Sequence, residues 1–397
     1  MGNVPKLRFA EFSGEWEEKL LQEIASFSKG KGISKSDIDE NGTLECIRYG
    51  ELYTTYKEKI EEIKSKTNLS AKNLILSEFN DVIIPASGET QIDIATASCV
   101  LKDNVALSGD LNIIKTINNG LFLSYYLNSN KKFDIARLSQ GISVVHLYSS
   151  QLKTLKLNIP QKQEQEKIAS FLSAVDKKIE KIEEKIALQE KYKKAMMQKL
   201  FSQEIRFKND DGSDFPAWEE KKLGDVGKVS MCKRIMKDQT TLKGEIPFYK
   251  IGTFGKEADA FISKNLYENY KSKYSFPKKG DVLISASGTI GRLVVYDGLP
   301  SYFQDSNIVW ISNDEKIIKN KFLKFFYRTV NWNTENTTIA RLYNNNLRNI
   351  QISIPSLKEQ QKIANFLSSL DKKIEATKKQ KQKANEFKKG LLQQMFV

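Results

Sequence analysis

An internal repeat constrains the fold of this chain more than any other feature. Residues 159–180 align without gaps to residues 354–375, and fifteen of the 22 positions are identical. A repeat of this size means that one structural plan occurs twice along the chain. The sequence therefore predicts two tandem halves, each with a divergent block followed by a well-matched segment. Weaker matches pair residues 7–24 with 205–226, residues 79–90 with 278–289, and residues 109–115 with 304–310.

Each well-matched segment predicts one long helix of a coiled coil. Apolar residues recur in steps of four and three over about five heptads, the 3.5-residue period of a coiled-coil seam. Pro160 and Pro355 precede the helices, and proline fits the start of a helix. At about 1.5 Å per residue, 38 residues reach roughly 57 Å. The predicted seam contains Ile168, Leu172, Val175, Ile179, Ile182 and Ile186 in the first helix, and Ile363, Leu367, Leu370, Ile374 and Leu391 in the second.

Polar residues interrupt this seam at Gln189, Lys193, Lys381 and Lys388. Such positions commonly fix the register or the partner of a coiled coil, at some cost in stability. Two alternatives are an amphipathic helix packed on its own domain and a helix lying on a membrane surface. Few bulky aromatic residues and many acidic residues argue against the membrane. We expect the two helices to pair antiparallel, because two similar halves close around a two-fold axis.

The divergent blocks predict mixed α/β domains. Residues 81–86 and 281–286 read as buried strands, each ending in a Ser-Gly turn. The predicted fold is mixed α+β, with two similar globular domains separated by a long antiparallel two-helix coiled coil of pseudo-two-fold symmetry. The turns are Ser87-Gly88 and Ser287-Gly288, further strands are 112–116 and 307–312, and helices are 121–127 and 322–330. The predicted boundaries are 1–158 and 204–353 for the globular domains, and 159–203 and 354–397 for the helices.

Composition narrows the partners and the chemistry. Lys plus Arg number 63 against 49 Asp plus Glu, a net charge of +14, so a polyanion such as nucleic acid is the expected partner. His146 is the only histidine, which rules out a multi-histidine metal site. The three cysteines form no C-x-x-C, as suits a reducing compartment. No apolar run approaches a membrane span, and residues 1–10 lack the apolar core of a signal peptide, so we expect a cytoplasmic protein without a membrane partner.

Catalytic motifs are missing from the sequence. The stretch 28–37 carries Lys35-Ser36 but lacks the glycine that a P-loop places before its lysine. There is no Pro-Pro, so the Pro-Pro loop with which adenine methyltransferases hold a flipped base is absent. No acidic cluster recurs in both halves, although spacing alone does not exclude a nuclease built on paired carboxylates. We therefore expect a binding subunit with no catalytic, cofactor or metal site of its own.

Two basic heads on a stiff spacer suit duplex DNA with two short sequence elements, about 34–36 Å apart. Because the heads differ in sequence, the two half-sites should differ as well. Basic and polar residues at predicted turns are the candidates for phosphate and base contacts, although a solvated surface charge, or a turn that needs glycine, explains each one alone. The candidates are Lys29, Lys31, Arg48, Tyr49, Ser87, Arg137 and Gln140 in the first block, and Lys233, Arg234, Lys250, Ser287, Arg292, Arg341 and Asn344 in the second.

The duplicated motif I-P-x-x-x-E-Q-x-K-I-A-x-F-L-S-x-x-D-x-K-I, starting at Ile159 and Ile354, resembles the specificity subunit of type I restriction–modification systems. The stretch GDVLISASGTIG at 280–291 resembles a recurring piece of that family's target-recognition domains. The resemblance implies two target-recognition domains that read a bipartite, asymmetric DNA site, and an antiparallel coiled coil that sets the gap between its halves. It also implies two modification subunits that bind S-adenosylmethionine and methylate adenine at N6, and restriction subunits that use ATP and Mg. None of this catalysis would reside in the chain itself.

Two other functions are compatible with these features. One is a non-enzymatic coiled-coil scaffold with non-specific affinity for nucleic acid, and the other is a self-contained enzyme. Sequence preference at moderate salt separates a reader from a scaffold, because phosphate contacts alone give binding that falls steeply with salt and ignores sequence.

Overall fold

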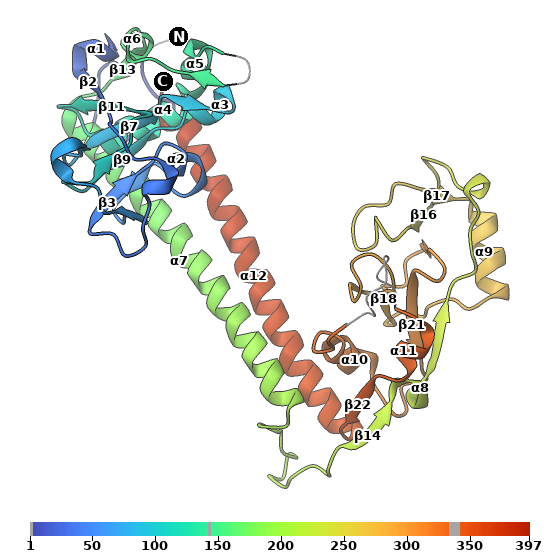
Figure 1. Ribbon diagram of the computed structural model, residues 1–397. Coiled ribbons are helices and arrows are strands. Elements are labelled where there is room, and N and C mark those ends of the chain that lie inside the picture. The colour runs from blue at the N-terminus through green and yellow to red at the C-terminus, as the bar shows by residue number, and fades with distance from the viewer. Residues whose placement is uncertain (1–2, 142–143, 333–341) are drawn as a thin grey trace. The chain divides into compact units, whose positions relative to one another are not determined.

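The computed structural model describes residues 3–141, 144–332 and 342–397. Its contacts divide the chain into unit 1, residues 1–184 with 378–397, and unit 2, residues 185–377. Each unit combines a globular part with portions of two long helices, α7 (Lys162–Phe201, 40 residues) and α12 (Leu357–Met395, 39 residues) (Figure 1). We call the globular part of unit 1 head 1 and that of unit 2 head 2. The two predicted long helices are confirmed, and the predicted domain boundaries stay a prediction.

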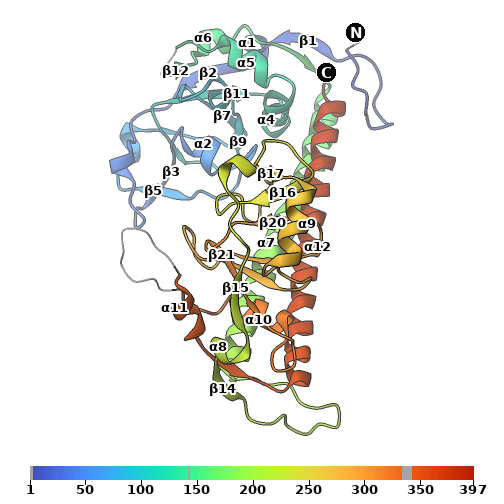
Figure 2. The same ribbon diagram turned by 90° about the vertical axis from the view of Figure 1, so that its right-hand side faces the viewer.

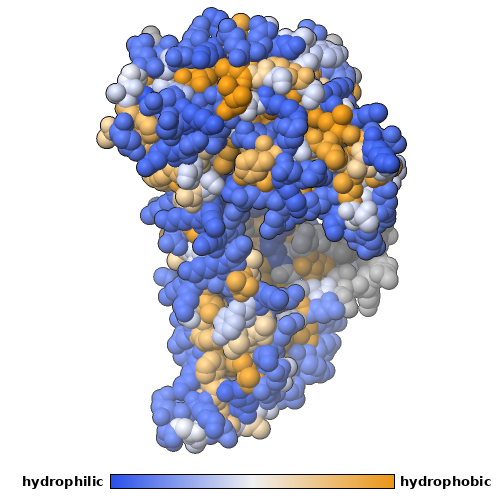
Figure 3. Space-filling view, turned by 90° about the vertical axis from the view of Figure 1, so that its left-hand side faces the viewer, coloured by the Kyte–Doolittle hydropathy of each residue, from blue (hydrophilic) through white to orange (hydrophobic). Residues whose placement is uncertain are grey.

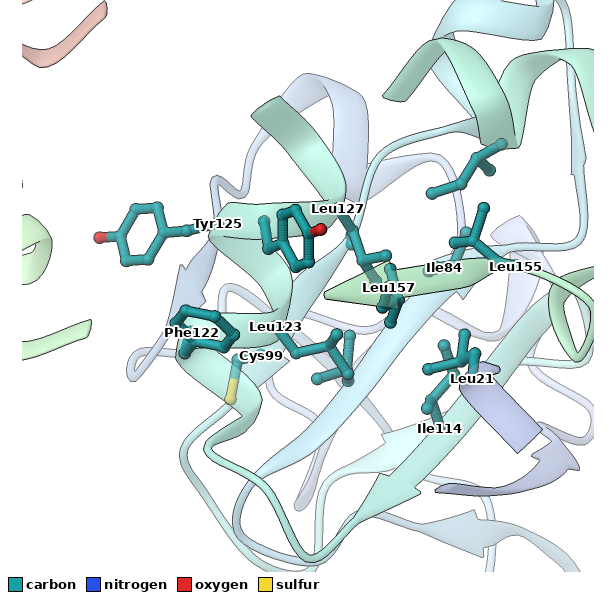
Figure 4. Close-up of a cluster of buried hydrophobic side chains, with 14 of the residues drawn as sticks. Leu21, Ile84, Cys99, Ile114, Phe122, Leu123, Tyr125, Leu127, Leu155 and Leu157 are labelled. Atoms are coloured by element: carbon teal, nitrogen blue, oxygen red, sulfur yellow. The ribbon is translucent and has the colours of Figure 1, made fainter. Parts of the chain in front are cut away.

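Head 1 is built on a five-stranded sheet of order β2-β11-β7-β9-β4, flanked by a four-stranded sheet of order β5-β3-β10-β6. Its central strand β7 is buried along its whole length, and α4 covers one face with the apolar side chains of Figure 4, among them Phe122, Leu123 and Leu127. The strands are β1 (Glu17–Leu20), β2 (Ala25–Lys29), β3 (Leu44–Ile47), β4 (Lys59–Ile60), β5 (Ser65–Thr67), β6 (Ile75–Leu76), β7 (Asp81–Pro85), β8 (Ser87–Gly88), β9 (Ser98–Val100), β10 (Ala106–Leu107), β11 (Leu111–Thr116), β12 (Val145–His146) and β13 (Lys156–Ile159). The helices are α1 (Leu21–Ile24), α2 (Glu51–Thr54), α3 (Gln91–Ile94), α4 (Gly120–Ser129), α5 (Lys132–Leu138) and α6 (Ser149–Leu152), with 3-10 turns η1 (Lys35–Asp37) and η2 (Ala71–Asn73).

Head 2 repeats this plan with a four-stranded sheet of order β15-β21-β18-β19 and a three-stranded sheet of order β17-β16-β20. In both heads, the strand that enters the domain pairs with the strand that leads into the long helix, β1 with β13 and β14 with β22. The strands are β14 (Glu219–Lys222), β15 (Lys228–Met231), β16 (Ile246–Tyr249), β17 (Phe261–Ile262), β18 (Val282–Ser285), β19 (Leu293–Val295), β20 (Tyr302–Phe303), β21 (Ile308–Ser312) and β22 (Gln351–Ile354). The helices are α8 (Leu223–Val226), α9 (Lys264–Lys273), α10 (Asn320–Phe326) and α11 (Asn344–Arg348), with the 3-10 turn η3 (Lys237–Gln239).

The predicted strands and helices of the heads are largely confirmed, with two corrections. Ser87-Gly88 is not a turn but the short strand β8, because its backbone pairs with β12 from a distant part of the chain. Gly288, in contrast, has the left-handed φ of +63° that a turn uses. The helix predicted over 322–330 is α10 and ends at Phe326. Beyond Phe326 the backbone forms turn bonds to the third preceding residue, Arg328 to Phe325 at 3.1 Å and Thr329 to Phe326 at 2.8 Å. The Thr329 hydroxyl also donates to the Phe326 carbonyl at 2.7 Å.

The strand pairing also shifts one sequence match by two residues. The equivalent strands β7 and β18 place Pro85 opposite Leu111 and Ser285 opposite Ile308. Leu111 therefore corresponds to Ile308, whereas the match of 109–115 with 304–310 pairs Ile308 with Ile113. Side chains alternate along a strand with a period of two, so a shift of two keeps the same residues inward and leaves the hydropathy pattern unchanged.

A buried carboxylate ties each long helix to its own head. The Glu164 side chain, in the first turn of α7, is fully buried and accepts two hydrogen bonds from Arg8, both at 2.7 Å. The indole of Trp16 donates a third at 3.3 Å. A buried carboxylate requires partners of this kind, because its desolvation is otherwise uncompensated. The repeat places Glu359 in the same position in α12, where it accepts from Arg206 at 3.1 and 2.7 Å and from Trp218 at 3.1 Å.

The C-terminal end of each long helix packs into the head from which the other long helix begins. In unit 1, Leu391 and Met395 of α12 and Phe396, which directly follows the helix, belong to the apolar core of head 1. The Phe396 ring stacks on Tyr126 at 5.2 Å. In unit 2, Leu200 of α7 is buried in the core of head 2, and the Phe201 ring lies 5.3 Å from Phe322. Each head is thus completed by residues that come from the other long helix.

Ion pairs show that the helices are antiparallel. In unit 1, Lys388 pairs with Asp176 at 2.8 Å and Lys381 pairs with Glu183 at 2.9 Å. A step of seven residues forward along α7 therefore matches a step of seven backward along α12, and the two segments run side by side (Figure 1 and Figure 2). In unit 2, Lys193 pairs with Asp371, two positions that continue the same antiparallel register along α7 and α12. Three of the four polar interruptions of the predicted seam thus form ion pairs between the helices.

The residues of the predicted seam divide into three groups. Ile168, Leu172 and Leu391 join the core of head 1, and Val175 packs against it. Ile363, Leu367 and Leu370 join the core of head 2. The first turns of each long helix therefore pack on the head that precedes the helix. The alternative of an amphipathic helix packed on its own domain thus describes these turns, although it was stated for the whole helix. Ile179 and Ile374 are buried outside these two cores, and Ile182 and Ile186 are half-buried.

Truncation of Phe396 tests the packing of α12 into head 1. Phe396→Ala should lower the free energy of unfolding of unit 1 by about 3–5 kcal/mol, since a large buried ring is removed and leaves a cavity. Phe387→Ala on α12 is the matched control, because that side chain is 56% exposed, and it should cost less than about 1 kcal/mol. Urea denaturation followed by circular dichroism measures both, and equal effects would contradict the packing.

Asp371 gives unit 2 an acid-sensitive contact. Burial alone would raise the pKa of Asp371, but the adjacent Lys193, Arg328 and Lys324 outweigh burial and hold it below its ordinary value. A carboxylate with a lowered pKa stabilises the fold above its unfolded pKa, and this stability is lost as the pH falls through about 4 and below.

The variant Asp371→Asn should therefore lower the stability of unit 2 at pH 7 but flatten its decline between about pH 5 and pH 3. Tryptophan fluorescence during urea denaturation reports on this, since three of the four tryptophans lie in unit 2. Glu268→Gln on α9 removes one exposed carboxylate as a control and should leave the pH profile unchanged. A profile for Asp371→Asn that matches the unsubstituted chain would refute this role.

Candidate nucleic-acid interface

In head 1, the turn between β10 and β11 gathers four of the predicted contact residues. Lys29 ends β2, and its ammonium lies 3.8 Å from Asp110 in this turn. The Lys31 backbone donates to the Leu107 carbonyl at 2.9 Å. Arg48 and Tyr49 follow β3, and the Tyr49 backbone donates to the hydroxyl of Ser108 at 3.3 Å. Lys29 and Lys31 are exposed, whereas Arg48 and Tyr49 are half-buried.

A second group lies beside this turn. Ser87 pairs with His146 across β8 and β12, and the backbones of His146 and Gln140 exchange hydrogen bonds of 2.7 and 2.9 Å. The Ala86 backbone donates to the Asp110 carbonyl at 2.8 Å, which joins the group to the turn. His146 is exposed on strand β12. Arg137, on α5, is exposed and pairs with Asp134 at 3.5 Å.

Head 2 repeats the arrangement around residues 304–307, which precede β21. The Arg234 Nε donates to Asp305 at 2.7 Å, and the Ser287 hydroxyl bonds Asn307 at 2.9 Å. The backbone of Ile251, next to Lys250, donates to the Gln304 side chain at 2.8 Å.

The remaining candidates of head 2 have other surroundings, and one of them lies outside the described part of the chain. Lys233 is exposed, and its ammonium lies 5.1 Å from the centre of the Tyr274 ring. The Arg292 Nη1 donates to the Phe254 carbonyl at 2.9 Å. Asn344 is exposed at the start of α11. Arg341 lies outside the described residues.

A cleft of about 600 Å³ opens in head 2 beside Arg234, Lys250 and Asp305. It brings together cations, carboxylates and two side-chain amides, the groups that bond phosphates and base edges. Lys250 is held there by Asp259 at 2.9 Å. The polar residues that line the cleft are Arg234, Lys237, Thr240, Thr241, Lys250, Asp259, Gln304, Asp305 and Asn307.

The described residues contain no cluster of three or more histidine, cysteine or acidic side chains that could hold a metal ion. The three cysteines are free and buried. Burial raises the pKa of Cys46 to about 11 and the pKa of Cys99 and Cys232 to about 12. The thiols are therefore protonated at neutral pH and are poor nucleophiles.

The surface suits a polar partner. The face in Figure 3 is dominated by hydrophilic side chains, with apolar patches scattered between them. In the described part of the chain, no helix combines the length and the apolar character required to traverse a bilayer. Together with the net charge of +14, this surface favours contact with a polyanion.

Several residues of the interface were missed by the sequence reasoning. Asp110 and Asp305 each lie beside a candidate cation, and Gln304 and Asn307 line the cleft of head 2. A signal was present, since the matched stretches 109–115 and 304–310 both contain an aspartate just before a buried strand. Only strand pairing, however, brings these aspartates beside the cations.

Gly30 allows the turn of head 1 to form. A Cβ at this position would lie 2.0 Å from the Ser108 carbonyl oxygen and 2.6 Å from that of Leu107. Gly30→Ala should therefore force the turn apart and lower the free energy of unfolding by about 2–4 kcal/mol. Gly252→Ala meets no atom within 4 Å and should change it by less than about 0.5 kcal/mol. Thermal or urea denaturation compares the two, and a Gly30→Ala variant of unchanged stability would contradict the described turn.

Comparison with known proteins adds to this geometry. Residues 13–190 and 217–386 match a family model described as the type I restriction modification DNA specificity domain. A putative type I restriction enzyme specificity subunit of Haemophilus influenzae is 62% identical over 150 residues, which is 38% of this chain and 39% of that protein. The putative MjaX specificity subunit of Methanocaldococcus jannaschii is 26% identical over 98% of this chain and 95% of its own. The crystal structure of a type I restriction-modification S subunit from M. genitalium shares the fold, with a TM-score of 0.62, 18% identity and 99% of both chains covered.

Proposed function

The chain belongs to the family of type I restriction–modification DNA specificity domains, and from this we propose that it is the DNA specificity subunit of a type I restriction–modification complex. In this role it reads a bipartite, asymmetric site in double-stranded DNA. It recruits modification subunits, which methylate adenine at N6, and restriction subunits. Those partner subunits catalyse methylation and cleavage, and the chain itself recognises the DNA site in the cytoplasm.

One observation carries the proposal. Both heads present basic and polar side chains around the same turn of the same fold, but the side chains differ. Head 1 places Lys29 beside Asp110, whereas head 2 places Arg234 beside Asp305. A lysine is a point charge and an arginine is a planar fork, so the two surfaces suit different base sequences. Two unlike readers on one chain account for an asymmetric, bipartite target.

The long helices supply the spacing in this proposal. Helix α7 is continuous over 40 residues, which corresponds to about 60 Å. Ion pairs such as Asp176 with Lys388 and Lys193 with Asp371 hold α7 and α12 in one register. In this proposal the helix pair sets the distance between the two half-sites, as bipartite recognition requires.

The helix pair also offers a surface for modification subunits, of which we propose two. In unit 1, an apolar groove of about 510 Å³ lies between α7 and α12. Phe387 is 56% exposed at this groove, and an exposed apolar surface of this kind is typical of a protein interface. The lining residues are Phe171, Ala174, Val175, Lys178, Ile182, Gln380, Lys383, Ala384 and Phe387.

Exchange of one head tests the proposal. Residues 1–158 are replaced by the matching block of another specificity subunit that keeps aromatic residues at the positions of Phe122 and Tyr126, because these pack on Phe396. The complex with modification subunits should then methylate a site with one half changed and the other half retained. A map of methylated bases in cells that carry the complex measures this.

A change in both half-sites would contradict modular heads. Absence of any sequence preference at moderate salt, with binding that falls steeply as salt rises, would instead indicate a non-specific scaffold. Methylation by the purified chain alone would indicate a self-contained enzyme.

A further inference from the structure

Arg234 and Asp305 meet because their strands are neighbours. Arg234 follows the end of β15 by three residues, Asp305 precedes β21 by three residues, and the two strands are paired. The Arg234 Nε donates to the Asp305 carboxylate at 2.7 Å. The arginine side chain is 67% exposed, while the aspartate is only 15% exposed. A charged donor is therefore presented outward by a mostly buried acceptor.

The acceptor is held in place by its own turn. The backbone of Ile308 donates to the Asp305 carbonyl at 2.9 Å. The neighbouring residue Gln304 donates through its backbone to Tyr249 at 2.9 Å and accepts from the Ile251 backbone at 2.8 Å. With the backbone of this turn anchored and the Asp305 side chain mostly buried, the bond to Nε limits rotation of the guanidinium, so less conformational entropy is lost when a ligand binds.

The bond to Nε leaves the two terminal nitrogens of Arg234 for a ligand. Among the described residues, neither terminal nitrogen makes a hydrogen bond. Two parallel N–H donors of a planar fork match the O6 and N7 acceptors of guanine in the major groove. A lysine ammonium in this position cannot reproduce that geometry.

The other cations of head 2 are less suited to this task. Lys250 is paired with Asp259 at 2.9 Å, and one terminal nitrogen of Arg292 donates to the Phe254 carbonyl. In head 1, Lys29 lies 3.8 Å from Asp110. Strand pairing matches Lys29 to Met231 and Asp110 to Asn307, so this pair is not the equivalent of Arg234 with Asp305. The oriented fork is thus a feature by which head 2 differs from head 1.

We propose that Arg234 reads a guanine in the half-site bound by head 2, and that Asp305 is the positioning residue that holds its guanidinium. The inference rests on the proposed function and names one determinant of its specificity. The contact is a major-groove pair of hydrogen bonds to a single base pair at the cleft.

The test uses the full chain assembled with its modification subunit and compares three variants. Arg234→Lys keeps the charge but removes the fork, and Asp305→Asn removes the anchoring charge. Lys237→Ala is the control, since it removes one positive charge from the same cleft. Two measurements are made, the methylated-base map and competition binding among duplexes that differ at one base pair.

Arg234→Lys should reduce the preference for guanine at one position of one half-site by roughly 5- to 150-fold, the range expected for one bidentate base contact. Asp305→Asn should weaken the same preference at the same position. Lys237→Ala should weaken binding to all duplexes alike and reduce the salt dependence. The half-site of head 1, unchanged in every variant, reports that the complex is folded.

Other results would overturn the inference. If Arg234→Lys keeps the guanine preference, or loses affinity equally for all sequences, Arg234 contacts phosphate. If the half-site of head 2 contains no position that requires a G·C pair, the proposed contact of Arg234 with guanine is wrong, although the proposed function of the chain stands. If Asp305→Asn leaves the preference intact, the positioning role fails. A failure of the proposed function would look different, since the unsubstituted complex would then show no bipartite preference at all.

Discussion

A buried carboxylate at the start of each long helix is the interaction on which the rest of the structure depends. The side chains of Glu164 and Glu359 are withdrawn from water, and paired bonds from Arg8 and Arg206 and a third bond from an indole compensate for this burial. These arginines precede their heads in sequence, while the glutamates follow them. One interaction therefore closes each head and fixes where its helix leaves it. A carboxylate in the first turn also faces the positive end of the helix dipole.

The repeat and its periodicities allowed much of the fold to be predicted. Strands and long helices follow from patterns that depend on neighbours in sequence, and antiparallel pairing follows from the duplication, because two similar halves close around a two-fold axis. The errors in the predicted fold occur where a segment distant in sequence determines the local structure. Ser87 and Gly88 read as a turn because strand β12, nearly sixty residues later, was not visible as their partner. The shift between Leu111 and Ile113 was undetectable because it preserves the alternation of inward and outward side chains. For the candidate site, basic residues at turns were predictable, whereas the aspartates beside them were not.

The interrupted seam shows the same limit from another side. A lysine at an apolar position of the heptad can be recognised from the sequence, but the residues with which it pairs cannot. Burial alone would lower the pKa of Lys388, yet Glu58 and Asp176 outweigh burial and raise it, and the ammonium also lies 5.3 Å from the centre of the Tyr125 ring. These partners come from a loop of head 1, from α7 and from α4. In unit 2, Lys193 pairs with Asp371 and lies 5.9 Å from the ring of Phe325. The same device therefore recurs with an aromatic ring in both units.

The packing of Leu391, Met395 and Phe396 into head 1 has a consequence for biosynthesis. A ribosome delivers these residues only after it has made all of head 2. Until then, the aromatic slot between Trp16, Phe122 and Tyr126 is open to solvent. The head that emerges first is therefore completed last, and its nascent form offers an apolar surface that a chaperone can shield.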